Sequence, residues 1–301
     1  MLDNVILITM MKIYHTPVLI NEVIDLLDIK KEDIIMDCTV GEGGHSEKIL
    51  LLINKFGHLY GIDRDKEALG TAKKRLSLIK TNFTLIHGNF ANILNITKEY
   101  NITRINKIIV DLGISSLQIE IEERGFSFKR EGLLDMRMNR EERTTALEII
   151  NSFPEYEIAD IIYKYGEERF SRKIAKKIVN YRKSKMIKTT TELSEIIKKA
   201  YPHKWQKIHP ATRTFQALRI EVNKELENLE KFLENFSQIL AKDGRIAIIS
   251  YHSLEDRLIK TYFKQNKKLD ILNKKVIKPT SEEISRNPRS RSAKLRGAEK
   301  L

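Results

Sequence analysis

Short apolar runs alternate with amphipathic stretches through the first third of the chain. The apolar runs have the length of strands, and the stretches between them repeat apolar residues every three or four positions. We predict strands at 33–38, 57–63, 83–88 and 107–112, and helices at 45–54 and 66–79. Strands that alternate with helices indicate an α/β fold with a parallel sheet and right-handed crossovers.

The pattern changes in the middle of the chain. Residues 115–211 are helical and charge-rich in pattern and contain no strong strand. Apolar positions then recur at spacings of three and four from Phe215 to Phe236, which predicts one long helix. A fifth strand at 245–251 and an edge pair at 269–279 follow, before a basic tail that is poor in apolar residues. We expect a sheet domain made of residues 1–114 and 212–301, with an inserted helical domain at 115–211.

The composition indicates what kind of partner the protein binds and in which compartment it resides. The 301 residues carry a net charge of +13, which indicates an acidic partner, with nucleic acid ahead of an anionic membrane surface. A single cysteine, Cys38, excludes a disulfide framework within the chain and fits the reducing cytoplasm. No apolar run approaches the roughly 18 residues of a membrane helix, and the start lacks the basic region of a signal peptide. Translation could begin at Met1, Met10 or Met11.

A glycine-rich loop follows the first predicted strand. Ligands of open parallel sheets bind at the carboxyl ends of the strands, where glycines allow a close approach of the backbone. Gly41, Gly43 and Gly44 lie there, and Asp63 closes the second strand, where a carboxylate suits a ribose diol. The loop reads GEGGHS, so Ser46 replaces the third glycine of the dinucleotide fingerprint. This favours S-adenosylmethionine, which has no pyrophosphate, over a nucleotide cofactor or a purely structural turn.

Two later strand ends fit an adenosine pocket. Phe90 follows the third strand and either packs against adenine or belongs to the core. Asp111 ends the fourth strand, between the expected positions of cofactor and acceptor. Its carboxylate either orients the methionine ammonium, binds the amine to be methylated, or caps a helix.

Longer motifs resemble one bacterial family. The matching stretches run in order through most of the chain: HTPVLINEVIDLL (15–27), TVGEGGHS (39–46), GIDRD (61–65), DLGISS (111–116), ERGFSF (123–128), LDMRM (134–138), YGEERFSRKIAKKIV (165–179), HPATRTFQALRIEVNKEL (209–226), GRIAIISYHSLEDRLIK (244–260) and NPRSRSAKLR (287–296). They resemble the ribosomal RNA small subunit methyltransferase H family, also called MraW. The resemblance implies a class I, Rossmann-like methyltransferase sheet with an inserted all-helical subdomain for substrate recognition.

The resemblance also implies a reaction and a set of contacts. Members transfer a methyl group from S-adenosylmethionine to the exocyclic N4 of a cytidine in the decoding region of 16S rRNA, cytidine 1402. The family's cofactor contacts fall on the following residues here: Gly43, Gly44, His45, Asp63, Phe90, Asp111 and Gln118. Leu117 stands where proline is common, which makes the placement of Gln118 less secure.

Methyl transfer to an amine needs an acceptor for its hydrogens, because the N4 lone pair is delocalised into the ring. Asp111 is the first candidate for this role, although it could serve the cofactor alone. Ser115, Ser116 and His252 are second candidates, with a capping histidine as the alternative for His252. We predict no catalytic metal.

The target base must be unpaired or flipped out of its helix, and phosphate contacts should supply much of the remaining affinity. The candidate contacts are Arg137, Arg213, Arg219, Arg289, Arg291 and Arg296, each with a solvated surface charge or a structural ion pair as its alternative. Trp205 and Tyr201 could stack on RNA, although core packing is the simpler interpretation.

Other functions stay open at this point. A nicotinamide-dependent oxidoreductase would use the same fold, and a non-catalytic ribosome-assembly protein could retain the cofactor pocket. A methyltransferase could also act on DNA or protein. The RNA partner is 16S rRNA in the small subunit or in an assembly intermediate, and the oligomeric state, a homodimer included, is not determined by the sequence.

Overall fold

A computed structural model describes residues 17–201 and 208–301, so His15, Trp205 and the three candidate start methionines lie outside the described residues. The chain forms two compact units. The first comprises residues up to Gly113 together with Glu230–Leu301, and the second comprises Ile114–Leu229. Each unit is described here by itself.

The first unit is built on a seven-stranded sheet in the order β3-β2-β1-β4-β5-β7-β6. Strands β1 to β5 run parallel to one another, whereas β7 is antiparallel to both β5 and β6. The predicted α/β fold of the class I methyltransferase type is confirmed. The strands are β1 (Ile34–Asp37), β2 (His58–Asp63), β3 (Phe83–His87), β4 (Ile105–Asp111), β5 (Leu240–Ser250), β6 (Leu269–Ile271) and β7 (Lys294–Lys300).

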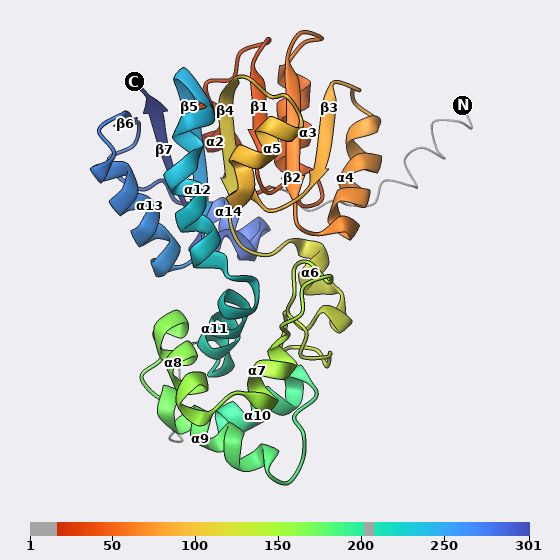
Figure 1. The fold of residues 1–301 in the computed structure, drawn as a ribbon, viewed down its shortest axis with the longest axis vertical. Coiled ribbons are helices and arrows are strands. Elements are labelled where there is room, and N and C mark those ends of the chain that lie inside the picture. The colour runs from red at the N-terminus through yellow and green to blue at the C-terminus, as the bar shows by residue number, and fades with distance from the viewer. Residues whose placement is uncertain (1–16, 202–207) are drawn as a thin grey trace, which may run out of the picture. The chain divides into compact units, whose positions relative to one another are not determined.

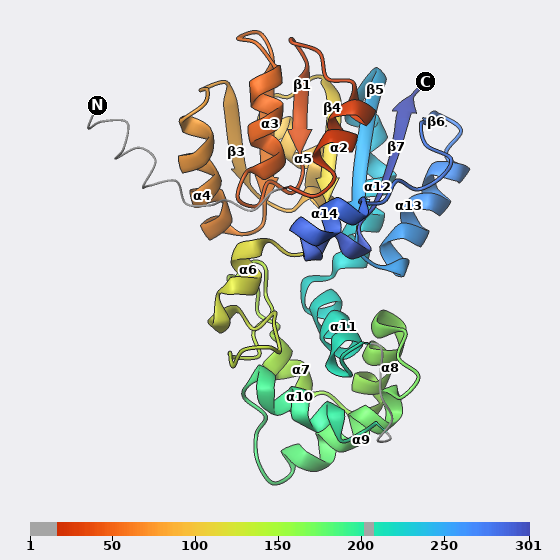
Figure 2. The same ribbon diagram turned by 180° about the vertical axis from the view of Figure 1, so that it is seen from behind.

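Helices cover both faces of this sheet. Figures 1 and 2 show α5 (Ile93–Glu99), α12 (Glu225–Ile239) and α13 (Ser253–Gln265) on one face. The other face carries α2 (Ile20–Leu27), α3 (Gly44–Leu52), α4 (Lys66–Ser77) and α14 (Ser281–Arg286). Two single-turn 3-10 helices, η1 (Phe90–Asn92) and η3 (Pro288–Ser292), complete the unit.

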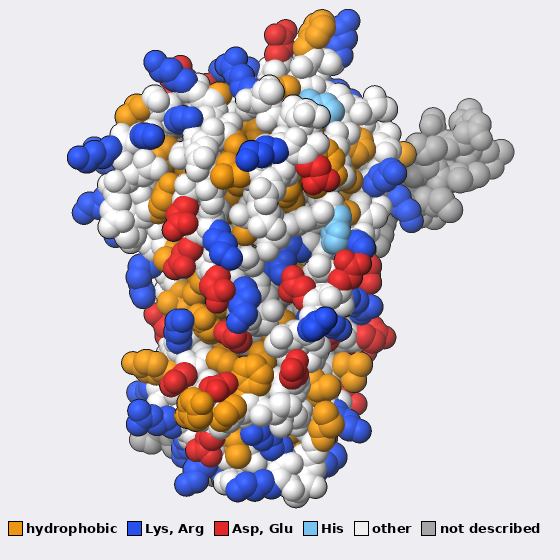
Figure 3. Space-filling model, viewed as in Figure 1, with side chains coloured by type: hydrophobic (Ala, Val, Ile, Leu, Met, Phe, Trp, Pro, Cys, Tyr) orange, Lys and Arg blue, Asp and Glu red, His pale blue; other side chains and the backbone are white. Residues whose placement is uncertain are grey.

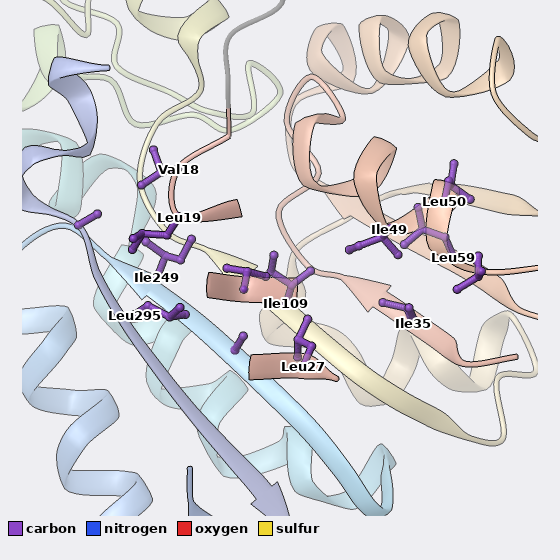
Figure 4. Close-up of a cluster of buried hydrophobic side chains, with 14 of the residues drawn as sticks. Val18, Leu19, Leu27, Ile35, Ile49, Leu50, Leu59, Ile109, Ile249 and Leu295 are labelled. Carbon is purple, nitrogen blue, oxygen red and sulfur yellow. The ribbon is translucent and has the colours of Figure 1, made fainter. Parts of the chain in front are cut away.

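The core explains the apolar runs in the sequence. Ile35 of β1, Ile109 of β4 and Ile249 of β5 pack with Leu27 of α2 and Ile49 of α3 in one buried cluster (Figure 4). Central parallel strands are covered on both faces, so they read as continuous apolar runs instead of alternating ones. This buried layer fixes the carboxyl ends of β1, β2 and β4 beside one another.

The second unit is helical among its described residues. Its elements are α6 (Ser116–Glu120), η2 (Glu122–Arg124), α7 (Ala146–Ser152), α8 (Glu155–Gly166), α9 (Ser171–Arg182), α10 (Thr190–Lys198) and α11 (Ala211–Asn223). Helix α11 packs on α8, and a Cβ at Gly166 would lie only 2.7 Å from the Arg213 carbonyl oxygen. Residues 212–229 therefore belong to the helical unit, whereas the sequence had grouped them with the sheet. The single long helix predicted at 212–236 is also wrong, because Lys224 adopts a left-handed conformation, with φ of 51°, between α11 and α12.

The basic tail expected at the end of the chain is a strand. Residues 294–300 form β7, which lies between β5 and β6 inside the sheet. Leu295 is fully buried, and Gly297 faces α2 so closely that a Cβ there would lie 2.4 Å from Leu26. Because only small residues fit where β7 meets α2, the strand contains few large apolar residues that would identify it in the sequence. Among the described residues, no helix is long and apolar enough to span a bilayer.

Candidate functional site

The glycine loop connects β1 to α3 at the carboxyl edge of the sheet. Gly41 and Gly43 have φ of 53° and 84°, in the left-handed region that favours glycine. Gly43 is the N-cap of α3, and Gly44 is its first residue. A Cβ on Gly44 would lie 2.8 Å from the Pro17 ring. Two of these glycines thus shape the turn, and the third makes room for the preceding segment.

Asp63 ends β2 and holds this loop in place. Its carboxylate accepts hydrogen bonds from the Gly41 amide at 2.7 Å and from the Asp65 amide at 2.9 Å. Burial raises the pKa of Asp63, and these backbone bonds oppose the rise. Because a carboxylate offers about four acceptor positions, Asp63 keeps capacity for a ribose hydroxyl.

Asp111 ends β4 and is bound from two sides. Its amide donates to Thr39 Oγ1 at 2.6 Å, and its Oδ1 accepts a hydrogen bond from the Tyr251 hydroxyl at 2.8 Å. Burial raises the pKa of Asp111 to about 7, and the bond from Tyr251 works against that rise. The side chain is 24% exposed, so a ligand can reach it. Asp111 is thus a carboxyl group that changes charge near neutral pH.

His45 faces Asp111 from the first turn of α3. Its Nε2 lies 3.0 Å from the Val18 carbonyl oxygen, which can only accept, so Nε2 carries the hydrogen. Nδ1 lies 3.7 Å from Asp111 Oδ2. Burial lowers the pKa of His45, so the ring is neutral at physiological pH and presents an unprotonated Nδ1 to Asp111.

Asp37 belongs to the same site and was missed in the sequence. It ends β1, accepts a hydrogen bond from Ser46 Oγ at 2.6 Å, and accepts another from the Thr39 amide at 3.1 Å. Burial raises its pKa to about 6. Ser46, which replaces the third glycine of the dinucleotide fingerprint, therefore holds a buried carboxyl group.

A simple signal could have found Asp37 and Tyr251. Asp63 and Asp111 were singled out because each ends a parallel strand. Asp37 ends β1 in the same way, and Tyr251 follows β5 directly. Carboxylates thus end three adjacent strands, β2, β1 and β4, and their negative charge suits a cationic ligand better than a pyrophosphate.

Phe90 and His252 occupy other positions in the first unit. The half-buried Phe90 packs edge-on against Phe232 of α12, with ring centroids 5.4 Å apart. His252 is the N-cap of α13, and its Nδ1 accepts the Glu255 amide hydrogen bond at 3.4 Å. The Glu255 carboxylate in turn accepts hydrogen bonds from the amides of Tyr251 and His252. The cap therefore positions Tyr251, the partner of Asp111.

Ser115, Ser116 and Gln118 lie in the second unit. Ser115 is the N-cap of α6, where its Oγ accepts from the Gln118 amide and Gln118 Oε1 accepts from the Ser115 amide. This capping box forms with Leu117 in place of the family's proline. The predicted roles of these three residues in cofactor binding or catalysis stay predictions.

The six candidate RNA-binding arginines fall into two groups. Arg137, Arg219 and Arg296 make ion pairs inside their own unit, with Asp135, Glu225 and Asp256. Each of these side chains is at most 21% exposed. Arg213, Arg289 and Arg291 are the more exposed group, although Arg213 also lies 3.7 Å from the Glu168 carboxylate and donates to the Glu167 carbonyl oxygen. Guanidinium groups that already bind carboxylates are less available to phosphate.

Known proteins resemble this chain over almost its whole length. The model of the MraW methylase family matches residues 12–301. Ribosomal RNA small subunit methyltransferase H of Clostridium botulinum (strain Kyoto / Type A2) is 47% identical, over 97% of this chain and 100% of that protein. The protein of the same name from Thermosipho africanus is 49% identical, over 95% of this chain and 98% of its own. Among solved structures, an rRNA methylase from Streptococcus thermophilus aligns with a TM-score of 0.44 and 14% identity, covering 94% of this chain and 93% of its own.

Proposed function

The chain belongs to the MraW methylase family, and we propose that it methylates RNA of the small ribosomal subunit. S-adenosylmethionine is the methyl donor. We infer that the acceptor is the exocyclic N4 of a cytidine in the decoding region of 16S rRNA. The match to two methyltransferases of that subunit over nearly the full chain carries this proposal. The cytoplasm, where ribosomal subunits are found, is the proposed location.

The residues of the first unit fit this methyl donor. S-adenosylmethionine supplies a methyl group on a positively charged sulfur, beside an ammonium group and a ribose. Asp63 offers acceptor capacity for the ribose, and Asp37 and Asp111 offer negative charge at the neighbouring strand ends. Gly41 and Gly43, in left-handed conformations, let the backbone approach without side chains. We propose that Gly44, His45 and Phe90 complete these contacts, together with Gln118.

Asp111 is the proposed acceptor for a hydrogen of the N4 amine. Methylation replaces one N–H bond of this amine by an N–C bond, so one proton must leave. A carboxylate within hydrogen-bond reach localises the nitrogen lone pair and takes that proton. A general base works best when its pKa is near the operating pH, and burial raises the pKa of Asp111 to about 7. Tyr251 is the proposed positioning residue, because its hydroxyl fixes Oδ1.

The helical unit is proposed to recognise RNA, with Arg213, which is 45% exposed beside Glu168, binding phosphate. Cytidine N4 is occupied in a base pair, so the enzyme must take an unpaired base or flip one out, at a cost of a few kcal/mol. Phosphate contacts would offset that cost, and affinity should therefore fall as salt rises.

One experiment tests reaction and acceptor together. Labelled S-adenosylmethionine is supplied with small subunits, and separately with naked 16S rRNA, from cells that lack the modification. Mass spectrometry then identifies the labelled nucleoside. We expect label in N4-methylcytidine. If the protein binds S-adenosylmethionine but labels no nucleoside, the proposed acceptor is rejected. If it neither binds the cofactor nor transfers label, the cofactor assignment for the glycine loop is rejected.

Asp111→Asn separates the two roles of that residue. We expect kcat to fall by at least about 100-fold, with a smaller change in the dissociation constant of S-adenosylmethionine. Asp25→Asn, on the exposed face of α2, is the matched control. A loss confined to cofactor affinity would contradict the proposed role of Asp111 toward the amine.

A further inference from the structure

A second pocket lies in the first unit, at the edge of the sheet that is farthest from β3. It has a volume of about 270 Å³ and is formed by α13, the end of β6 and the loop that follows. Strands β5 and β7 separate β6 from β4, so the pocket is distinct from the cofactor site. This volume is slightly below the roughly 300 Å³ at which the usual range of ligand pockets begins.

The pocket combines an apolar floor with a cationic rim. The half-buried Ile271, with the 2% of the Phe263 surface that is exposed, forms its small apolar floor, and Lys260, Lys264 and Lys274 line its sides. Lys260 and Lys264 are one helical turn apart on α13, so they point to the same side. All three lysines are exposed, and no described carboxylate forms an ion pair with them.

The rim is held in a fixed position. Asn273 donates to the Leu295 carbonyl oxygen at 3.0 Å and accepts from the Gly297 amide at 2.7 Å. These bonds tie the loop that carries Lys274 to β7. Arg296 also lines the pocket, but Asp256 binds its guanidinium at 2.6 Å, so the lysines supply the unpaired charge.

The surrounding surface is also basic. Between Arg257 and Lys278 the sequence has eight basic residues and one acidic residue, Asp270. Figure 3 shows Lys and Arg side chains around the area where Figure 1 places α13 and β6. An anionic partner is therefore attracted to this edge of the sheet.

We propose that this pocket binds one unstacked nucleotide of a single-stranded RNA segment. The base packs mainly against Ile271, beside the small exposed part of Phe263, and the lysines bind the flanking phosphates. Proteins hold single strands by combining contacts to the bases with a positively charged groove along the backbone. The proposal rests on the proposed function for the presence of RNA, and it places a contact of that RNA away from the methylated base.

The test uses full-length protein and a fluorescein-labelled hexacytidylate RNA. The variant is K260A/K264A/K274A, and the control is K55A/K73A/K74A, which removes the same charge from exposed positions near the β3 edge. We expect the variant to bind about tenfold more weakly, with the salt slope reduced by about 2, since each single-strand phosphate contact contributes roughly 0.7. The control should lose less than threefold.

An abasic hexamer with the same backbone tests the apolar floor. We expect the wild type to bind the cytidine hexamer more tightly than the abasic one, and the variant to lose most affinity for both. Equal losses in the two triple variants would overturn the site. An oligoglutamate peptide that displaces the RNA equally well would overturn the assignment to RNA.

Methylation of subunits is measured in parallel. A wild type that binds the hexamer through these lysines but methylates no subunit would overturn the proposed function and leave the site intact. If the wild type methylates subunits and K260A/K264A/K274A binds the hexamer as tightly as the wild type, the pocket is overturned and the proposed function stands.

Discussion

The hydroxyl of Tyr251 donates a hydrogen bond to Asp111 Oδ1 at 2.8 Å and so connects the ends of β5 and β4. Asp111 is the group proposed to accept the amine proton, and the bond from Tyr251 lowers its pKa against the stronger effect of burial. Tyr251→Phe should therefore raise the pKa of Asp111 above about 7. We expect the acidic limb of the profile of kcat against pH to move to higher pH, with activity recovering at alkaline pH.

Tyr262→Phe is the control for this prediction, because its hydroxyl binds Asn266 on α13 and not Asp111. Loss of activity at every pH with an unmoved profile would mean that Tyr251 serves only the packing of this strand end.

The raised pKa of Asp111 also predicts how stability depends on pH. The folded chain binds the proton more tightly than the unfolded chain, whose pKa is near 3.8. The contribution of this carboxyl to the free energy of unfolding is full below pH 4 and is lost as pH rises toward 7. Asp111→Asn should therefore be more stabilising at pH 8 than at pH 4, by on the order of 1–3 kcal/mol. Urea unfolding without cofactor measures the difference, and an equal effect at both pH values would contradict a buried, proton-binding Asp111.

Gly43 and Gly70 make a matched pair of glycines. Gly43 has φ of 84°, and a Cβ there would contact Ala72 at 3.4 Å, whereas a Cβ on Gly70, inside α4, would meet nothing within 4 Å. Gly43→Ala should lower the free energy of unfolding by about 1–2 kcal/mol and weaken S-adenosylmethionine binding. Gly70→Ala should raise stability by roughly 0.5–1 kcal/mol and leave binding unchanged. Urea unfolding measures stability, and calorimetric titration measures S-adenosylmethionine binding. Unchanged stability and binding in Gly43→Ala would show that the loop does not need the left-handed turn.

Asn223 fixes the segment LDMRM inside the helical unit. Its side chain is fully buried, accepts from the Met138 amide at 2.7 Å, and donates to the carbonyl oxygens of Met136 and Arg219. Met136 is held there with φ of 61°. Asn223→Ala leaves these groups without their partner and should cost about 2–3 kcal/mol of stability. Asn235→Ala, at a half-buried position on α12, should cost less. Similar values for both variants would contradict the role of Asn223.

The two groups of arginines predict different phenotypes. Arg219 binds both carboxylate oxygens of Glu225, at 2.7 and 2.8 Å. Arg219→Ala should mainly lower thermal stability. Arg291 is exposed, so Arg291→Ala should leave stability unchanged and weaken RNA binding, with a lower salt slope. Anisotropy titrations at several salt concentrations, with thermal melts, separate the two outcomes. If Arg219→Ala weakened RNA binding without lowering thermal stability, Arg219 would belong to the RNA-binding group instead.

Sequence patterns were strongest where strands are buried on both faces. The first five strands were predicted because runs such as residues 34–36 are apolar throughout, and position along the chain then identified Asp63 and Asp111 as strand ends. The role of Asp37 depends on its burial beside Ser46, which only the folded structure shows. The break at Lys224 interrupts an apolar period that continues across it, so periodicity alone could not show it. Strand β7 was missed because Gly297 and Ala298, which its crowded place requires, carry little apolar signal.

The position of β7 has a consequence for biosynthesis. This strand comes last in chain order but lies between β5 and β6, so the edges of both strands stay unpaired until residues 294–300 are available. Unpaired strand edges invite pairing with other chains. A nascent chain that has exposed everything up to α13 still lacks the strand that closes this half of the sheet. The protein can therefore complete its fold only after residues 294–300 have been synthesised, and their removal should yield aggregation and not a smaller enzyme.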